Sequence, residues 1–308
     1  MPKINVSKSI FISAPVDKVF SQINDFNNWS AWSPWIVLDD KTVVNVQPGG
    51  KSYSWEGFRI GSGHMEIENE VANKSIDCDL VFIKPWKSKA KTGFIFEENK
   101  EGTTVTWTMD SSLPFFMFFM KKMMIAFIGM DYERGLKMLK DKVENGRVNS
   151  ELTISKSNTF SAKKYIGIKG TCSIADIGLD MSKKIPLIHD CLKKNNLSNE
   201  NEIVSIYHNW DMINQKTTYT IGAFVDGIPT ELNSNFITGE IPKIKVNTIT
   251  HKGAYEHVGN AWSMQMMMMS RNKEFKQNKK IDPFEIYKNS PYNTPNEELI
   301  TEVVFPVL

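Results

Sequence analysis

The pattern of hydrophobic and polar positions in the first half of the chain predicts a strand, a helix, a run of strands and a second helix. Residues 8–13 alternate as a half-buried strand does, and Pro15 stands where helices commonly begin. Between Val16 and Phe26 the apolar residues recur at helical spacing. Turn residues then separate short apolar runs, which predicts an antiparallel meander with strands at 52–58, 63–71, 75–83, 89–96 and 103–109.

An apolar stretch follows at residues 113–129, interrupted by Lys121 and Lys122. A membrane span needs about 20 nearly uninterrupted apolar residues. We therefore expect no membrane span here. Residues 129–144 place Leu136, Leu139 and Val143 on one side, which predicts one long helix from the apolar stretch to the end of this half.

The second half repeats one order of elements, strand, helix, strand, strand. The polar residues 145–150 predict a linker, so we place one domain at 1–147 and another at 152–308. Two β-α-β-β units can bury their helices on one side of a shared antiparallel sheet, with a pocket at their junction. The predicted elements are 161–170, 178–195, 202–207 and 217–224 in the first unit, and 243–253, 255–275, 284–287 and 299–307 in the second.

Composition narrows the class of protein. With 308 residues, 41% of them hydrophobic, and a net charge of +2, the chain fits two globular domains and no polyanion-binding module. Three cysteines without a C-x-x-C spacing argue against a disulfide framework, and the five histidines lack metal-ligand spacing. We expect no metal and no cofactor. The first residues show no secretory leader, so we expect a cytoplasmic protein.

Several segments of the first half carry a family resemblance. Residues 10–20 (IFISAPVDKVF), 25–35 (DFNNWSAWSPW), 104–107 (TVTW) and 129–140 (GMDYERGLKMLK) resemble the SRPBCC superfamily of polyketide cyclase, START and helix-grip proteins. The resemblance implies an α+β fold in which a curved antiparallel sheet wraps a long C-terminal helix and leaves an apolar ligand cavity. The aromatic residues that we expect to line this cavity are Trp29, Trp32, Trp35, Trp55, Phe58, Trp107, Phe115, Phe116 and Phe127.

The second half resembles another family. Residues 251–257 (HKGAYEH), 282–287 (DPFEIY) and 293–307 (NTPNEELITEVVFPV) are similar to the GyrI-like, or AraC-type effector-binding, domain, which occurs alone or fused to DNA-binding domains in multidrug-sensing regulators. The resemblance implies a pocket with a buried glutamate among aromatic residues. Glu285 occupies the matching position, and we expect Tyr255, Trp262, Tyr287 and Trp210 around it. No helix-turn-helix segment precedes either domain, so we expect no direct binding to nucleic acid.

Two acids in apolar strands point to the same place. Glu285 and Glu302 lie in segments whose apolar pattern predicts strands. An ionised carboxylate removed from water costs several kcal/mol unless it is paired or neutralised. Either acid faces solvent on a half-buried strand, or one of them lies in a pocket. A carboxylate ringed by aromatic faces attracts lipophilic cations. Glu285 is our candidate for the pocket acid, and Glu302 is the second.

The sequence leads to three functional hypotheses. The first is a non-enzymatic protein with two small-molecule-binding modules, which senses or sequesters amphipathic, aromatic or cationic compounds. The second is a hydrolase or cyclase-type enzyme in which Glu285 acts as a general base; such a base needs a tuned pKa and a substrate proton within reach. The third is a regulatory protein that delivers a ligand signal to a separate DNA-binding protein or enzyme. Its expected protein partner is either such a protein or a second copy of this chain.

Overall fold

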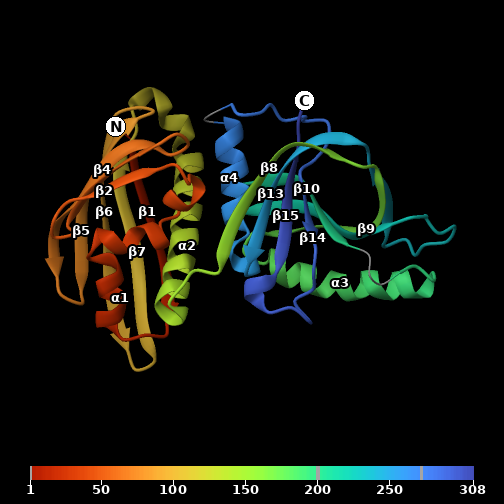
Figure 1. The fold of residues 1–308 in the computed structure, drawn as a ribbon, viewed down its shortest axis with the longest axis horizontal. Coiled ribbons are helices and arrows are strands. Elements are labelled where there is room, and N and C mark those ends of the chain that lie inside the picture. The colour runs from red at the N-terminus through yellow and green to blue at the C-terminus, as the bar shows by residue number, and fades with distance from the viewer. Residues whose placement is uncertain (1, 199–201, 271–272) are drawn as a thin grey trace. The chain divides into compact units, whose positions relative to one another are not determined.

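The computed structural model describes residues 2–198, 202–270 and 273–308. The chain divides into two compact units, Met1–Asn149 and Ser150–Leu308, each built on an antiparallel sheet of its own (Figure 1). Among the described residues, no helix is long and apolar enough to cross a membrane.

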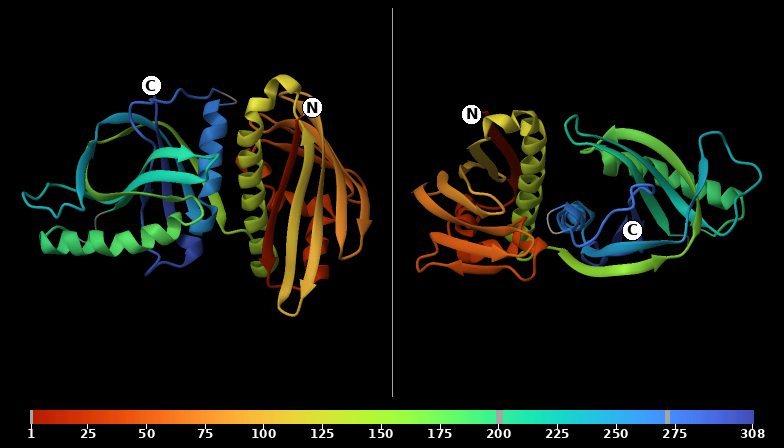
Figure 2. Two further views of the ribbon diagram at one scale, coloured as in Figure 1. Left: turned by 180° about the vertical axis from the view of Figure 1, so that it is seen from behind. Right: turned by 90° about the horizontal axis from the view of Figure 1, so that it is seen from above.

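The first unit is a seven-stranded sheet with the strand order β1-β7-β6-β5-β4-β3-β2, and a long helix, α2, lies along one of its faces (Figures 1 and 2). This arrangement confirms the predicted antiparallel sheet with a long C-terminal helix. Its elements, in which η marks a 3-10 helix, are β1 (Lys3–Ile12), α1 (Val16–Ile23), η1 (Phe26–Ala31), η2 (Ile36–Leu38), β2 (Val43–Val46), β3 (Ser52–Gly57), β4 (Gly61–Val71), β5 (Ser75–Lys84), β6 (Ser88–Asn99), β7 (Gly102–Ser112), η3 (Phe115–Met120) and α2 (Lys121–Asn145).

The two helices of this unit differ in their ends from the prediction. Helix α1 ends at Ile23, and Asp25 then caps η1 by accepting a hydrogen bond from the backbone N–H of Asn27 at 2.9 Å. The apolar stretch before α2 forms the separate 3-10 helix η3 and is not its first turns. Aromatic side chains lose rotamer freedom in an α-helix, which disfavours a phenylalanine-rich run there. Gly146, in the left-handed region at φ 77°, ends α2.

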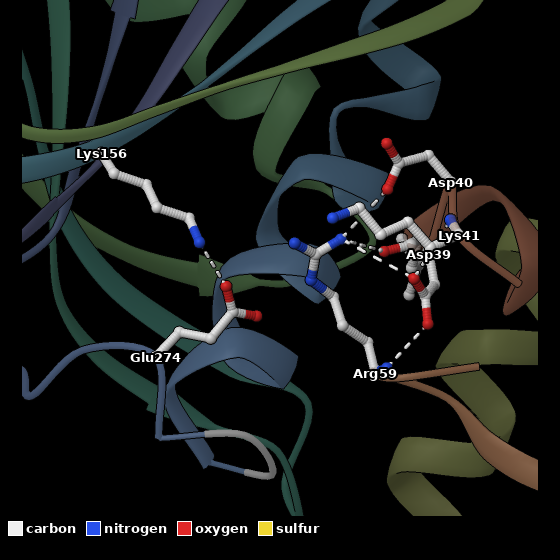
Figure 3. A network of polar contacts seen from close by, with 7 residues as sticks. Asp39, Asp40, Lys41, Arg59, Lys156 and Glu274 are labelled. Atoms are coloured by element: carbon white, nitrogen blue, oxygen red, sulfur yellow. Dashed lines mark hydrogen bonds and ion pairs between the residues drawn. The ribbon is translucent and has the colours of Figure 1, made fainter.

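Outside the helix-covered core, a buried acid fixes the turn between β3 and β4. Asp39 is 2% exposed and accepts a hydrogen bond from the backbone N–H of Arg59 at 2.7 Å, while the guanidinium of Arg59 lies 3.6 Å from the carboxylate of Asp40 (Figure 3). The same figure draws an ion pair of the second unit, in which Lys156 Nζ lies 2.5 Å from Glu274 Oε2.

The second unit is an eight-stranded antiparallel sheet with the order β12-β9-β11-β10-β14-β15-β13-β8. The segments β9-α3-β10-β11 and β13-α4-β14-β15 confirm the predicted duplication of a β-α-β-β unit. The two repeats meet at the centre of the sheet, where β10 pairs with β14. The elements are β8 (Ser150–Phe160), β9 (Lys163–Ser173), α3 (Ile177–Lys194), β10 (Ile203–Asp211), β11 (Lys216–Val225), β12 (Ile237–Ile241), β13 (Ile244–Gly253), η4 (Tyr255–His257), α4 (Gly259–Ser270), β14 (Phe284–Tyr287), η5 (Asn296–Glu298) and β15 (Ile300–Pro306).

The sequence pattern predicts neither edge strand of this sheet. Strand β8 precedes the first repeat but pairs with β13 of the second, and β12 precedes the second repeat but pairs with β9 of the first. The repeats therefore exchange their leading strands. Both strands have many exposed positions, and neither sustains over its length the apolar alternation by which a half-buried strand is recognised.

Candidate functional site

The acid at the centre of the second sheet is Glu285. It lies on β14 between Ser205 of β10 and Val303 of β15, and it is 5% exposed. Side chains alternate between the two faces of a strand, so Glu285 and Tyr287 share one face while the flanking residues of β14 point to the other. The first face belongs to the core cluster that includes buried residues of α3. The carboxylate is therefore held inside the unit, under its helices.

Three hydrogen-bond donors from three elements hold this carboxylate. Tyr207 on β10 donates from its hydroxyl to Oε2 at 2.9 Å, and Tyr287 donates to the same oxygen at 2.5 Å. The indole Nε1 of Trp262, on α4, donates to Oε1 at 2.5 Å. In the described part of the chain no lysine or arginine forms an ion pair with Glu285. The negative charge is thus solvated by neutral donors, and among the described residues it has no cationic partner.

Burial governs the acid–base chemistry of the cluster. Loss of water raises the pKa of Glu285, and the hydrogen bonds from Tyr287, Trp262 and Tyr207 partly offset that rise. Burial and the charge of Glu285 raise the pKa of Tyr207 and of Tyr287 well above 10. Tyr255 responds in the same way, with its pKa raised to about 12 by burial and by the charge of Glu285. The tyrosines therefore remain protonated donors throughout the neutral range.

Aromatic rings surround the donors. Tyr207 stacks on Trp210 with ring centroids 4.9 Å apart, and the edge of Trp262 meets Tyr207 at 4.9 Å. Tyr255 contacts the ring of Tyr287 at 5.6 Å. Among the residues that the structure describes, Trp210 Nε1 is buried without a hydrogen-bond partner. The structure thus brings together the four aromatic residues that the sequence places around Glu285.

Sequence reasoning missed part of this site. Tyr207 and its cross-strand partner Tyr219 lie on the same face, and the hydroxyl of Tyr219 donates to Asp180 Oδ2 at 2.6 Å. Lys184 Nζ pairs with the same oxygen at 2.5 Å. Tyr207 and Tyr219 carry no sequence motif, and only the register of β10 against β11 and β14 places Tyr207 beside both Tyr219 and Glu285.

The structure does not bring Glu302 into the site. Glu302 pairs with Ile286 across the β14–β15 ladder, whereas Glu285 pairs with Val303. Because cross-strand partners share a face, Glu302 projects to the opposite side of the sheet from Glu285. There it is half-buried, with Oε2 3.8 Å from Lys288 Nζ. The expectation that Glu302 lies in the pocket is therefore corrected: Glu302 forms an ion pair on the other face of the sheet.

The aromatic residues predicted for the N-terminal cavity fall into two groups. Trp29, Trp32 and Trp107 are at most 1% exposed and contact one another, and Trp107 stacks on Tyr132 of α2 at 4.0 Å. Trp55 is buried at the edge of this cluster, and Trp35 is half-buried. These rings form the core between sheet and helix. A ligand-binding role for them stays a prediction.

The second group lies at the surface. Phe58, Phe115, Phe116 and Phe127 are 66%, 77%, 74% and 40% exposed, so they do not join the aromatic core. Phe58 falls in the turn beyond the end of β3, and Phe115 and Phe116 belong to η3. Phe127 precedes the buried Tyr132 by five residues, which turns it by about 140° around α2.

Comparison with known proteins agrees with both resemblances. Residues 3–144 match the family model described as polyketide cyclase / dehydrase and lipid transport, and residues 156–308 match the model described as GyrI-like small molecule binding domain. A search among curated proteins finds no match.

Three solved structures illustrate the likeness of fold. The EcmrR–DNA complex is 19% identical over 60% of this chain and 68% of that chain, with a TM-score of 0.43. SAV2435 bound to tetraphenylphosphonium is 18% identical over 51% of this chain and 94% of that chain, with a TM-score of 0.39. Protein MLL2253 from Mesorhizobium loti is 12% identical over 47% of this chain and 99% of that chain, with a TM-score of 0.38. At these scores, no function is inferred from the likeness.

Proposed function

Because the chain consists of a polyketide cyclase / dehydrase and lipid transport domain followed by a GyrI-like small molecule binding domain, we propose that its second unit binds lipophilic cations beside Glu285. The single observation that carries this proposal is the buried carboxylate, which is held by three neutral donors and lacks a cation among the described residues. A bound cation would supply the missing opposite charge.

The gain from such a cation follows from Coulomb's law. Two unit charges about 5 Å apart attract each other by roughly 3 kcal/mol at an effective dielectric constant of about 20. The rings of Trp210 and Tyr255 add cation–π attraction of about 0.5 to 2 kcal/mol for each well-placed ring face. Charge and aromatic contact therefore favour a cation whose charge is spread over an apolar, aromatic body.

The unpartnered indole of Trp210 adds a polar contact for the ligand. A buried donor without a partner costs about 1 to 3 kcal/mol. An acceptor atom on a ligand would remove that cost, so ligands that combine a cationic centre with a hydrogen-bond acceptor should bind more tightly than their analogues without one. In the cell, such a protein would sense or sequester the compound, with its regulatory effect passing through a separate partner.

Calorimetric titration of the full chain with tetraphenylphosphonium tests the proposal. This probe is a permanent cation with an aromatic surface, and triphenylphosphine oxide is its neutral counterpart. Glu285→Gln should weaken binding of the cation by roughly 30- to 150-fold, the equivalent of about 2 to 3 kcal/mol. The same substitution should leave binding of the neutral compound nearly unchanged.

Glu302→Gln is the matched control, because that acid lies in the neighbouring strand on the other face of the sheet. It should bind the cation as the unaltered protein does. Equal losses for the two variants, or unchanged cation binding by Glu285→Gln, would contradict the assignment of the site.

A further inference from the structure

A cluster of exposed phenylalanines lies at one end of the first sheet. Phe115, Phe116, Phe118 and Phe119, which we call the phenylalanine tip, are 77%, 74%, 60% and 72% exposed. They belong to η3, between the end of β7 and the start of α2, beside the N-terminal end of the chain (Figures 1 and 2). Together they present on the order of 400 Å² of aromatic surface to solvent. A patch of that size is comparable to the largest apolar patch of a typical monomeric protein, and such patches are often functional.

The geometry of η3 shows how the tip is presented. A 3-10 helix has three residues per turn, so Phe115 and Phe118 project in one direction and Phe116 and Phe119 in a second. The third direction belongs to Met117 and Met120, which are half-buried. The tip is therefore apolar on both of its outward sides. A flat protein partner would cover one such side, whereas a fluid apolar phase surrounds both.

Within the chain segment that carries the tip, the charged residues have one sign. Between residues 111 and 130 the chain contains Lys121 and Lys122 and no aspartate or glutamate. Both lysines are exposed, and they occupy the first turn of α2, where the helix dipole disfavours positive charge. Helix stability thus gives no reason for them, while an anionic surface next to the tip would attract them.

An exposed tryptophan lies at the same end of the sheet. Strand β6 begins there and runs antiparallel to β7, with Ala90 opposite Ser111, so the turn between β5 and β6 lies near the start of η3. That turn contains Trp86, which is 58% exposed, followed by the exposed Lys87. Tryptophan beside lysine is the composition of protein segments that lie at the membrane–water interface.

We propose that this end of the first unit is a peripheral binding surface for an anionic phospholipid bilayer. The phenylalanine tip enters the boundary between headgroups and acyl chains, Trp86 lies at the level of the headgroups, and Lys121 and Lys122 contact lipid phosphates. The surface belongs to the first unit alone and does not depend on cation binding at Glu285.

Co-sedimentation of the full chain with vesicles tests this surface. The protein should sediment with phosphatidylcholine vesicles that contain phosphatidylserine and only weakly with pure phosphatidylcholine, and added salt should release it. The double variant F118S/F119S should partition at least roughly tenfold more weakly. Lys121→Glu with Lys122→Glu should abolish the preference for phosphatidylserine.

The control is V71S/I95S, because Val71 and Ile95 are each 46% exposed and lie at the opposite end of the same sheet. This variant should bind vesicles as the unaltered protein does, and thermal unfolding should show all variants to be folded. Failure of the unaltered protein to bind either vesicle, or equal loss by V71S/I95S, would overturn the proposal. So would sedimentation-velocity dimers that F118S/F119S dissociates while vesicle binding persists, since the tip would then contact a second copy.

Discussion

Removing one donor from Glu285 should raise the pKa of its carboxyl group by a measurable amount. In Tyr287→Phe the ring that contacts Tyr255 is kept, while the hydroxyl that donates to Oε2 at 2.5 Å is lost. A hydrogen bond to a charged group contributes about 1.5 to 3 kcal/mol, and one pKa unit corresponds to about 1.4 kcal/mol. The pKa of Glu285 should therefore rise, because the donor stabilises the ionised form more than the neutral form.

The carbon-13 shift of the Glu285 carboxyl, followed against pH, reports this pKa directly. Tyr219→Phe is the matched control, because its hydroxyl donates to Asp180 and not to Glu285. It should leave the midpoint of Glu285 in place and raise that of Asp180, whose pKa hydrogen bonds from Lys184 and Tyr219 help to lower against burial. An unchanged Glu285 midpoint in Tyr287→Phe, or an equal shift in both variants, would refute the reasoning.

Three further predictions concern stability. Burial raises the folded-state pKa of Glu285 above the value of about 4.3 in an unfolded chain. The free energy of unfolding should therefore fall as pH rises through the folded-state pKa. Urea titrations at several pH values should show that Glu285→Gln flattens this dependence. Asp39→Asn should lower the free energy of unfolding by about 1 to 3 kcal/mol, because it weakens the buried acceptor for the Arg59 N–H. Gly135→Ala should lower the melting temperature, because the added Cβ would lie 2.7 Å from an indole carbon of Trp107. Gly178→Ala, in the first turn of α3, should raise the melting temperature, because its Cβ meets nothing within 4 Å and alanine favours the helix.

The predictable part of the fold is the part whose periodicity comes from a single buried face. Strands β4 and β5 and helix α3 begin and end close to the expected positions, because their apolar residues recur with the period of the element. The sequence does not predict strands β8 and β12, because they lie at the exposed edges of the sheet and pair with strands of the other repeat. No local pattern specifies such an exchange.

The site divides in the same way. Glu285 is recognisable from sequence because an acid inside an apolar strand is costly wherever that strand pairs. The contact of Tyr207 with Glu285, and the face of the sheet on which Glu302 lies, both depend on the register of the strands. A shift of one residue moves a side chain to the other face of a sheet, and the sequence alone does not give that register. The exposed phenylalanines were expected in a cavity because composition cannot distinguish an aromatic residue of the core from one at a surface tip.

The position of Glu285 also explains why a buried acid survives in this fold. Tyr207 comes from the first repeat, while Trp262 and Tyr287 come from the second, so the carboxylate is fully hydrogen-bonded only where the repeats meet. An apolar side chain of similar size would avoid the desolvation penalty but would leave those donors unpaired, at about 1 to 3 kcal/mol for each one. A core selected for stability alone would need neither the acid nor the donors. Folding alone therefore does not account for the complete cluster, whereas the cation binding that we propose for Glu285 would.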